Sequence, residues 1–201
     1  MNSKFIIHFY SFHLTNAFLI TKTVQKQFLP LIFGKFIKKL IQCSMKITLL
    51  VVGKTDENYL KEGIRQYADR IKHYTDFRIE VIPDIKKSRN MRIEEQKMKE
   101  GERILTHWAP SKEIHLLDEN GKLFSSKMFA EFLQKKMASG LKEIIFVIGG
   151  PYGFSEEVSH KAQSKISLSR MTFSHQLARL LCTEQIYRAL TILKGEPYHH
   201  D

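Results

Sequence analysis

Three glycines lie within five residues directly after a strongly apolar run. The run is Glu143–Ile148 (EIIFVI), and the loop that follows is Gly149-Gly150-Pro151-Tyr152-Gly153. Glycine tolerates positive φ and lets backbone approach a ligand closely, and open α/β sheets bind ligands at the carboxyl ends of their strands. The loop is not G-x-G-x-x-G, and no acidic residue on a following strand is spaced to hold a ribose. A ligand-binding loop and a tight structural turn therefore both stay open.

A second unusual segment lies near the C-terminus. Residues 167–188 read SLSRMTFSHQLARLLCTEQIYR, which predicts a short strand, a polar and aromatic loop, and the start of a long helix. Arg179 and Arg188 are nine positions apart, which is about two and a half helical turns. They could hold an adenosine and steer a phosphate, or be ordinary solvated or ion-paired residues. The residues alone favour neither interpretation.

Other catalytic patterns are incomplete. Gly53-Lys54-Thr55 imitates the end of a phosphate-binding loop, but Thr48 stands where that motif requires its first glycine. The histidines are scattered, and adjacent His199-His200 point apart, so we predict no metal site. Cys182 lies in an apolar stretch and is expected to be a reduced core thiol. The G-x-S-x-G motif of serine hydrolases does not occur.

Composition limits the class of protein. The chain has 201 residues, with 32 Lys+Arg against 21 Asp+Glu and a formal charge of +11. This length suits one ordinary domain. Apolar residues make up 43% and charged residues 26%, as in folded soluble proteins, and two cysteines are too few for a disulfide scaffold. The basic charge points to a polyanionic partner, either nucleic acid or an acidic membrane surface.

The first 44 residues differ from the rest. They hold six lysines, no arginine and no acidic residue, which leaves +5 of the net charge for the other 157 residues. Their best apolar run, residues 5–20, is broken by polar residues such as His8 and Asn16, unlike a signal peptide or anchor. We expect residues 1–44 to be a non-native or disordered extension before a start at Met45, with a targeting segment and a structural element as alternatives. We expect no membrane association and a cytoplasmic location.

From Lys46 onward, short β-branched runs alternate with longer amphipathic ones. This alternation predicts an α/β domain over residues 45–201, with a mostly parallel sheet and helices on both faces. The predicted strands are 46–52, 77–82, 113–117, 143–148 and 165–169. The predicted helices are 58–74, 91–107, 125 or 126 to 137, 155–163 and 175–194. Glu119-Asn120-Gly121 is expected to form a turn.

Several segments together resemble one family. MKITLLVVGK (45–54), EGERILTHW (100–108), FVIGGPYGF (146–154), LSRMTFSHQLAR (168–179), EQIYRA (184–189) and GEPYHHD (195–201) are similar, in order and spacing, to the small SPOUT-class methyltransferases of the RlmH type. The resemblance covers residues 45–201. It implies a trefoil-knotted α/β fold, a homodimer, S-adenosylmethionine as the methyl donor without a metal, and N3-methylation of a pseudouridine in 23S rRNA within the assembled ribosome.

The resemblance also implies roles for individual residues. The expected cofactor contacts are Leu117, Gly149, Leu168, Ser169, Arg170, Met171, Thr172 and Phe173. Tyr198 and His199 match the family's tail and are expected to position or deprotonate the base, with His175 as an alternate. Arg179 or another cation would stabilise the developing negative charge.

Two questions stay open at this level. Lys86, Lys87, Arg89 and Arg92 are candidates for phosphate contacts, or belong to a merely solvated loop. The rival functions are a non-catalytic protein that docks on ribosomal RNA, and a nucleotide-dependent hydrolase or dehydrogenase that uses the glycine loop. Binding of S-adenosylmethionine would separate the main hypothesis from the first rival.

Overall fold

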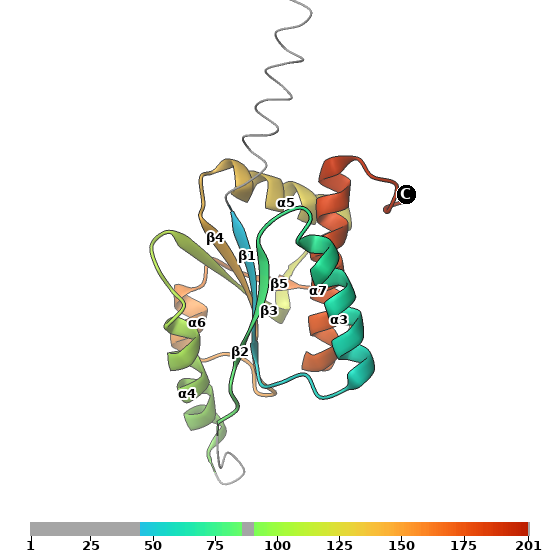
Figure 1. Ribbon diagram of the computed structural model, residues 1–201. Coiled ribbons are helices and arrows are strands. Elements are labelled where there is room, and N and C mark those ends of the chain that lie inside the picture. Colours follow the sequence, from blue (N-terminus) through green and yellow to red (C-terminus); the bar gives the residue numbers. More distant parts are fainter. Residues whose placement is uncertain (1–44, 86–90, 201) are drawn as a thin grey trace, which may run out of the picture. The chain divides into compact units, whose positions relative to one another are not determined.

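The computed structural model describes residues 45–85 and 91–200. The predicted extension 1–44 and the candidate phosphate contacts Lys86, Lys87 and Arg89 lie outside this part of the chain. The elements are β1 (Lys46–Val52), α3 (Asn58–Ile71), β2 (Phe77–Ile82), α4 (Ile93–Leu105), β3 (Lys112–Leu123), α5 (Ser126–Ala138), β4 (Glu143–Ile148), α6 (Glu156–Lys161), β5 (Ser164–Ser167) and α7 (His175–Lys194) (Figure 1).

The strands form one sheet in the order β2-β1-β4-β3-β5, and every pairing is parallel. β4 lies in the middle, where Ile145 is opposite Thr48 of β1 and Ile114 of β3. All six residues of β4 are buried, as expected for a parallel strand covered on both faces. The predicted mostly parallel α/β architecture is confirmed, whereas the trefoil knot stays a prediction.

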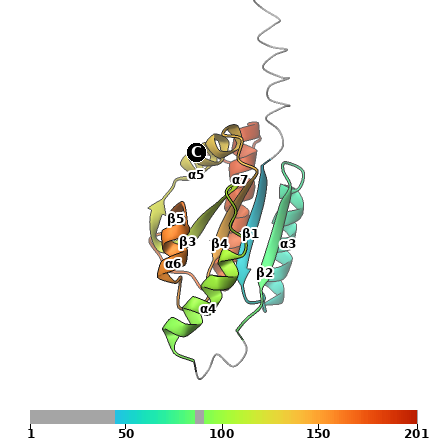
Figure 2. The same ribbon diagram turned by 90° about the vertical axis from the view of Figure 1, so that its left-hand side faces the viewer.

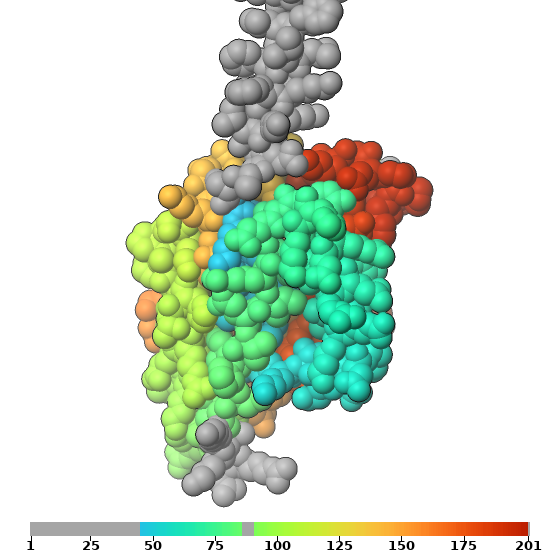
Figure 3. Space-filling view, viewed as in Figure 1, coloured from blue at the N-terminus to red at the C-terminus, as the bar shows by residue number. Residues whose placement is uncertain are grey.

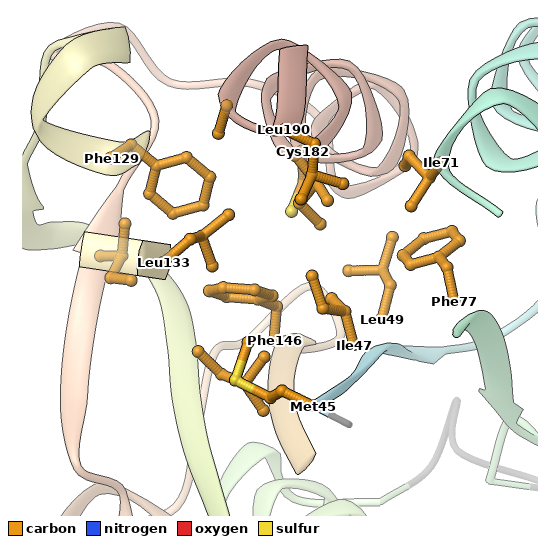
Figure 4. Packing of buried hydrophobic residues seen from close by; sticks show 14 of the residues in the cluster. Met45, Ile47, Leu49, Ile71, Phe77, Phe129, Leu133, Phe146, Cys182 and Leu190 are labelled. Atoms are coloured by element: carbon orange, nitrogen blue, oxygen red, sulfur yellow. The ribbon is translucent and has the colours of Figure 1, made fainter. Parts of the chain in front are cut away.

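Helices cover the two faces of the sheet in two groups. Helices α3, α5 and α7 lie on one face and α4 and α6 on the other (Figures 1 and 2). Phe146 and Leu49 point to the first face, where Leu133 of α5 and Cys182 and Leu190 of α7 close over them (Figure 4). Each such side chain contributes about 1.5–3 kcal/mol on full burial. Because strand residues alternate between faces, their neighbours join the second core, with side chains of α4 and α6.

Several predicted boundaries are confirmed by local chemistry. The predicted strands 46–52, 77–82 and 143–148 coincide with β1, β2 and β4. Ser125 caps α5 by accepting a hydrogen bond from the Met128 amide. Helix α7 begins after Ser174, whose hydroxyl accepts from the Leu177 amide, and ends at Gly195 with φ of 70°, a left-handed conformation that glycine adopts without strain.

The turn predicted at Glu119-Asn120-Gly121 is wrong, because β3 continues to Leu123. The pairing of β3 with β5 shifts register between Leu117 and Lys122, so the turn residues form an irregularity within the strand. A Cβ at Gly121 would lie 2.5 Å from the Ile166 amide nitrogen of β5. Only glycine fits at position 121, because the backbone of β5 occupies the space that a side chain would need.

The remaining elements differ from the predictions only at their ends. Helices α3, α4 and α6 are shorter than the predicted 58–74, 91–107 and 155–163, and β5 is Ser164–Ser167 instead of 165–169. After α3, the Tyr74 and Thr75 amides donate to the Ile71 carbonyl, which closes a turn and releases the chain toward β2. Within the described residues, no helix is long and apolar enough to cross a bilayer.

Candidate functional site

A cavity of about 690 Å³ opens at the carboxyl ends of β4 and β5, beside residues 117–120 of β3. Residues 117–120, 148–154, 166–169, 171–175 and 178 line it. These segments are far apart in sequence and meet because parallel strands bring their carboxyl ends to one edge of the sheet. The cavity therefore lies where open α/β sheets hold small ligands.

Seven of the eight predicted cofactor contacts line this cavity. They are Leu117, Gly149, Leu168, Ser169, Met171, Thr172 and Phe173. Arg170 does not line it, and its side chain is exposed. The walls are thus apolar side chains interspersed with backbone and small hydroxyls, which is typical of a site that holds an adenosine-sized ligand.

Short polar contacts hold the loop between β5 and α7. The Ser167 hydroxyl donates to the Ser169 carbonyl at 2.7 Å, and the Ser169 hydroxyl accepts from the Met171 amide at 2.9 Å. Thr172 donates to Glu119 Oε2 at 3.1 Å and so joins the loop to β3. Met171 itself is 73% exposed. A preformed loop with an uncovered apolar side chain suits a ligand that packs against it.

The glycine loop is both a tight turn and a wall of the cavity. Gly153 has φ of 77°, and its amide donates to the Gly150 carbonyl at 3.2 Å. A Cβ at Gly149 would lie 3.1 Å from the Phe154 ring, which lines the same cavity. The two interpretations of this loop are therefore compatible, because the turn presents bare backbone to the hollow.

Two acidic residues of the cavity were missed by the sequence reasoning. Asp118 and Glu119 line it directly after the expected end of the third strand. Asp118 lies 3.5 Å from the ammonium of Lys165. They were missed because a turn was expected at these positions. Residues that follow a parallel strand at its carboxyl end are nevertheless candidates for ligand binding, for the same reason as Gly149.

The predicted tail residue Tyr198 lies outside the cavity of its own chain. Its phenol donates to Glu184 Oε1 at 3.1 Å and lies 3.3 Å from the Tyr67 hydroxyl. Its ring packs edge-on against Tyr187, with centroids 4.7 Å apart. Burial, the hydrogen bond with Tyr67 and the negative charge of Glu184 raise the pKa of Tyr198 above its usual value of 10. In this arrangement Tyr198 is a phenol that donates, not a phenolate that accepts a proton.

Further contacts hold the tail against helices α3 and α7. His199 Nδ1 lies 3.4 Å from the guanidinium of Arg188, which in turn bonds to Glu184 at 2.9 Å through Nε. The Tyr74 hydroxyl of the segment after α3 donates to Glu196. Figure 3 shows the C-terminal segment at the surface beside α3. His175, the alternate base, lines the cavity at the first turn of α7.

Arg179 has a different environment from Arg188. It is 1% exposed, and its two terminal nitrogens donate to the Val52 carbonyl at 2.7 Å and to the Thr55 hydroxyl at 2.9 Å. Burial lowers the pKa of this guanidinium, although the charge of Asp56 acts in the opposite direction. Arg179 does not line the cavity. The structure therefore adds an anchoring function for the loop after β1, and the catalytic role stays a prediction.

The remaining reactive groups are potential metal ligands and the Cys182 thiol. Among residues 45–85 and 91–200, no three His, Cys, Asp or Glu side chains are grouped so that they could hold a metal ion. Cys182 is fully enclosed in the core, and burial raises the pKa of its thiol to about 12. A buried, unreactive thiol of this kind serves as a packing group in the core.

Comparison with known proteins gives a consistent set of relatives. The family described as "Predicted SPOUT methyltransferase" matches residues 45–199. A "Ribosomal RNA large subunit methyltransferase H" of Christiangramia forsetii is 60% identical over 156 residues, 78% of this chain and 99% of the relative. Its namesake in Parabacteroides distasonis is 55% identical over 157 residues, 78% of this chain and 100% of the relative.

One solved structure gives a much weaker likeness. It is the SpoU methyltransferase AviRb from Streptomyces viridochromogenes in complex with AdoMet, at a TM-score of 0.38 and 12% identity. The overlap covers 75% of this chain and 59% of that protein. So slight a likeness carries no argument about the fold or the cavity.

Proposed function

Because the chain belongs to the SPOUT methyltransferase family, among the RlmH-type enzymes, we propose that it methylates N3 of a pseudouridine in 23S rRNA, with S-adenosylmethionine as donor. We assign this activity to residues 45–201 and place it in the cytoplasm, on the assembled ribosome. The observation that carries the proposal is the cavity at the strand ends, which gathers seven of the eight expected cofactor contacts. This cavity belongs to a chain that is 60% identical to a ribosomal RNA methyltransferase.

The walls of the cavity fit the parts of this cofactor. Leu117, Leu168 and Phe173 supply apolar surface for an adenine ring, and Gly149 permits close approach of backbone. The bound donor supplies an electrophilic methyl group on a positively charged sulfur. The protein's own contribution is to hold the base in line with that methyl group and to exclude competing water.

The reaction also requires removal of the N3 proton of the base. Tyr198 and His199 are our candidates for positioning the base and receiving this proton, with His175 as the alternate. The raised pKa of Tyr198 favours a histidine as the acceptor and leaves the phenol as a positioning donor. Arg179 or another cation would stabilise negative charge on the base.

The position of the tail supports the proposed homodimer. Helix α7 begins at the cavity, but Tyr198 bonds to Glu184, nine residues beyond His175, or about 13 Å along the helix. A tail that acts on the base would therefore serve a second copy's cavity more easily than its own. Leu177 and Leu181 on α7 are only partly buried and could meet a partner.

The ribosomal partner would meet the same edge of the sheet. Arg92 is exposed and immediately precedes α4. Helix α4 follows the carboxyl end of β2, and the cavity also lies at the end of the sheet where the parallel strands have their carboxyl ends. We propose phosphate contacts for Arg92 together with Lys86, Lys87 and Arg89. Replacing Arg92 with alanine should weaken binding to ribosomes and reduce its salt dependence without affecting cofactor binding.

Two measurements test the proposed function. Calorimetry should detect S-adenosylmethionine binding at one site per chain, and mass mapping of 23S rRNA from a deletion strain should reveal one pseudouridine that has lost a methyl group. Returning the gene should restore the methyl group, and a Gly149→Ala version is the matched control with an impaired cavity. An unchanged methylation pattern in the deletion strain contradicts the proposal. Ribosome binding without cofactor binding would favour the non-catalytic rival.

A further inference from the structure

A buried carboxylate lies behind the glycine loop and has no role in the proposed methyl transfer. Glu100 of α4 is 4% exposed, and its Oε1 accepts a hydrogen bond from the Gln96 amide at 2.8 Å. Among the described residues, this neutral amide is its one polar partner, and no lysine or arginine pairs with it. Burying a carboxylate without a positive partner is costly. The arrangement is therefore suited to a cation that residues 45–85 and 91–200 do not supply.

The backbone of Gly150 lies between this carboxylate and the cavity. Gly150 lines the cavity, and a Cβ built on it would lie 2.7 Å from Glu100 Oε2 and 3.1 Å from Oε1. The carboxylate thus packs directly against the glycine, with no room for a side chain or for water between them. In a place from which water is excluded, a charge acts on its neighbours with little screening.

The charges of the cavity itself have the same sign. Of the residues that the structure describes, its lining includes Asp118 and Glu119 but no lysine or arginine, and Lys165, outside the lining, lies 3.5 Å from Asp118. Glu119 is exposed and bonds to the neutral Thr172 hydroxyl. An anionic ligand would meet repulsion on this lining, whereas a cationic ligand would be attracted. Glu100, together with Glu119 of the lining, therefore favours positive charge.

We propose that Glu100 is a specificity-determining residue that, across Gly150, favours the positively charged sulfonium of the methyl donor over the neutral thioether product. The inference rests on the proposed function, since it requires S-adenosylmethionine in this cavity. As the methyl carbon forms its bond to N3 of the base, its bond to sulfur breaks, and the electron pair of that broken bond stays on sulfur. The sulfur thereby loses its positive charge, the attraction ends, and the product S-adenosylhomocysteine is released more readily.

The test compares ligands that differ in charge at one atom. S-adenosylmethionine and S-adenosylhomocysteine compete for the purified full-length chain and for the Glu100→Gln variant, which keeps the shape and removes the charge. The affinity ratio of donor to product should fall about tenfold in the variant, which corresponds to about 1.4 kcal/mol. Sinefungin, which carries an amine in place of the methylated sulfur, should lose affinity in parallel with the donor.

Matched variants separate charge from shape. Glu102→Gln removes an exposed carboxylate from the same helix, two residues away and outside the cavity lining, so its ratio should match the wild type. Glu100→Asp keeps the charge and should keep most of the preference. Because both ligands compete for the same folded fraction, a loss of folded protein in any variant leaves the ratio unaffected.

Each result bears on one of the two proposals. Equal losses for donor and product in Glu100→Gln, or an equal change of ratio in Glu102→Gln, overturn the role of Glu100 while cofactor binding by the wild type stands. A wild-type chain that binds neither ligand overturns the proposed function itself.

Discussion

Replacing Tyr198 with phenylalanine removes one hydroxyl and leaves the ring in place. The hydroxyl donates to Glu184 Oε1 at 3.1 Å and lies 3.3 Å from the Tyr67 hydroxyl. The ring contacts are independent of it, since Tyr187 packs edge-on and the Arg188 guanidinium lies 4.7 Å from the ring centroid. The substitution therefore weakens the docking of the tail without abolishing it.

The size of the effect follows from the kind of bond lost. A hydrogen bond to a charged group contributes about 1.5–3 kcal/mol, and the lower end applies because Tyr198 is only partly buried. About 1.4 kcal/mol corresponds to a factor of ten. If the phenol only positions the tail, the docked population and the rate of methyl transfer should each fall by no more than about tenfold.

Single-turnover transfer of labelled methyl groups to ribosomes from a deletion strain measures this rate. The matched control is Tyr59→Phe, because Tyr59 is 68% exposed on α3, and its rate should equal that of the wild type. Hydrogen exchange, or the NMR chemical shifts of the Tyr187 ring, reports docking of the tail independently of the reaction rate. A thousandfold loss of rate with the tail still docked would refute the reasoning and make the phenol a participant in the chemistry.

Three further outcomes are expected. Arg179→Ala should lower the free energy of unfolding by about 3 kcal/mol in urea titrations, because the buried Val52 carbonyl loses its charged donor. His115 is buried, and burial lowers its pKa to about 4. Because the unfolded chain already binds this proton near pH 6.5, the free energy of unfolding should fall as the pH drops from about 6.5 toward 4. The His115→Gln variant should show a smaller fall. Gly149→Ala should weaken S-adenosylmethionine binding measured by calorimetry, with a smaller loss of stability, because its Cβ would press on the Phe154 ring at the cavity.

Each of these expectations would be contradicted by a particular result. Arg179→Ala with unchanged stability and a large loss of rate would favour the catalytic role over the anchoring function. An identical pH dependence in wild type and His115→Gln would show that carboxylates alone, such as Glu113, cause the acid instability. Unchanged cofactor affinity in Gly149→Ala would place the ligand elsewhere.

Local composition was sufficient for the elements whose signals are continuous. The strands over 46–52, 77–82 and 143–148 were predicted to the residue, because each is a short run of mainly β-branched and apolar residues that ends at a glycine or a proline. Helix α7 was also predicted to the residue, since Ser174 and Gly195 mark its two ends. Strand β3 was not, because its irregular part looks like a turn until β5 lies beside Gly121.

The sequence by itself determined the alternation of strands and helices, the location of the glycine loop and the family to which residues 45–201 belong. Only the tertiary structure decided which charged groups meet that loop. Glu100 and Gly150 of that loop are fifty positions apart. The same holds elsewhere in the fold, where Arg179 bonds to the Val52 carbonyl across 127 positions of the sequence. Such contacts depend on how helices pack over the sheet, and no local pattern of residues carries that information. The tail follows the same rule, because its aromatic and acidic partners on α3 and α7 become neighbours only when those helices lie side by side.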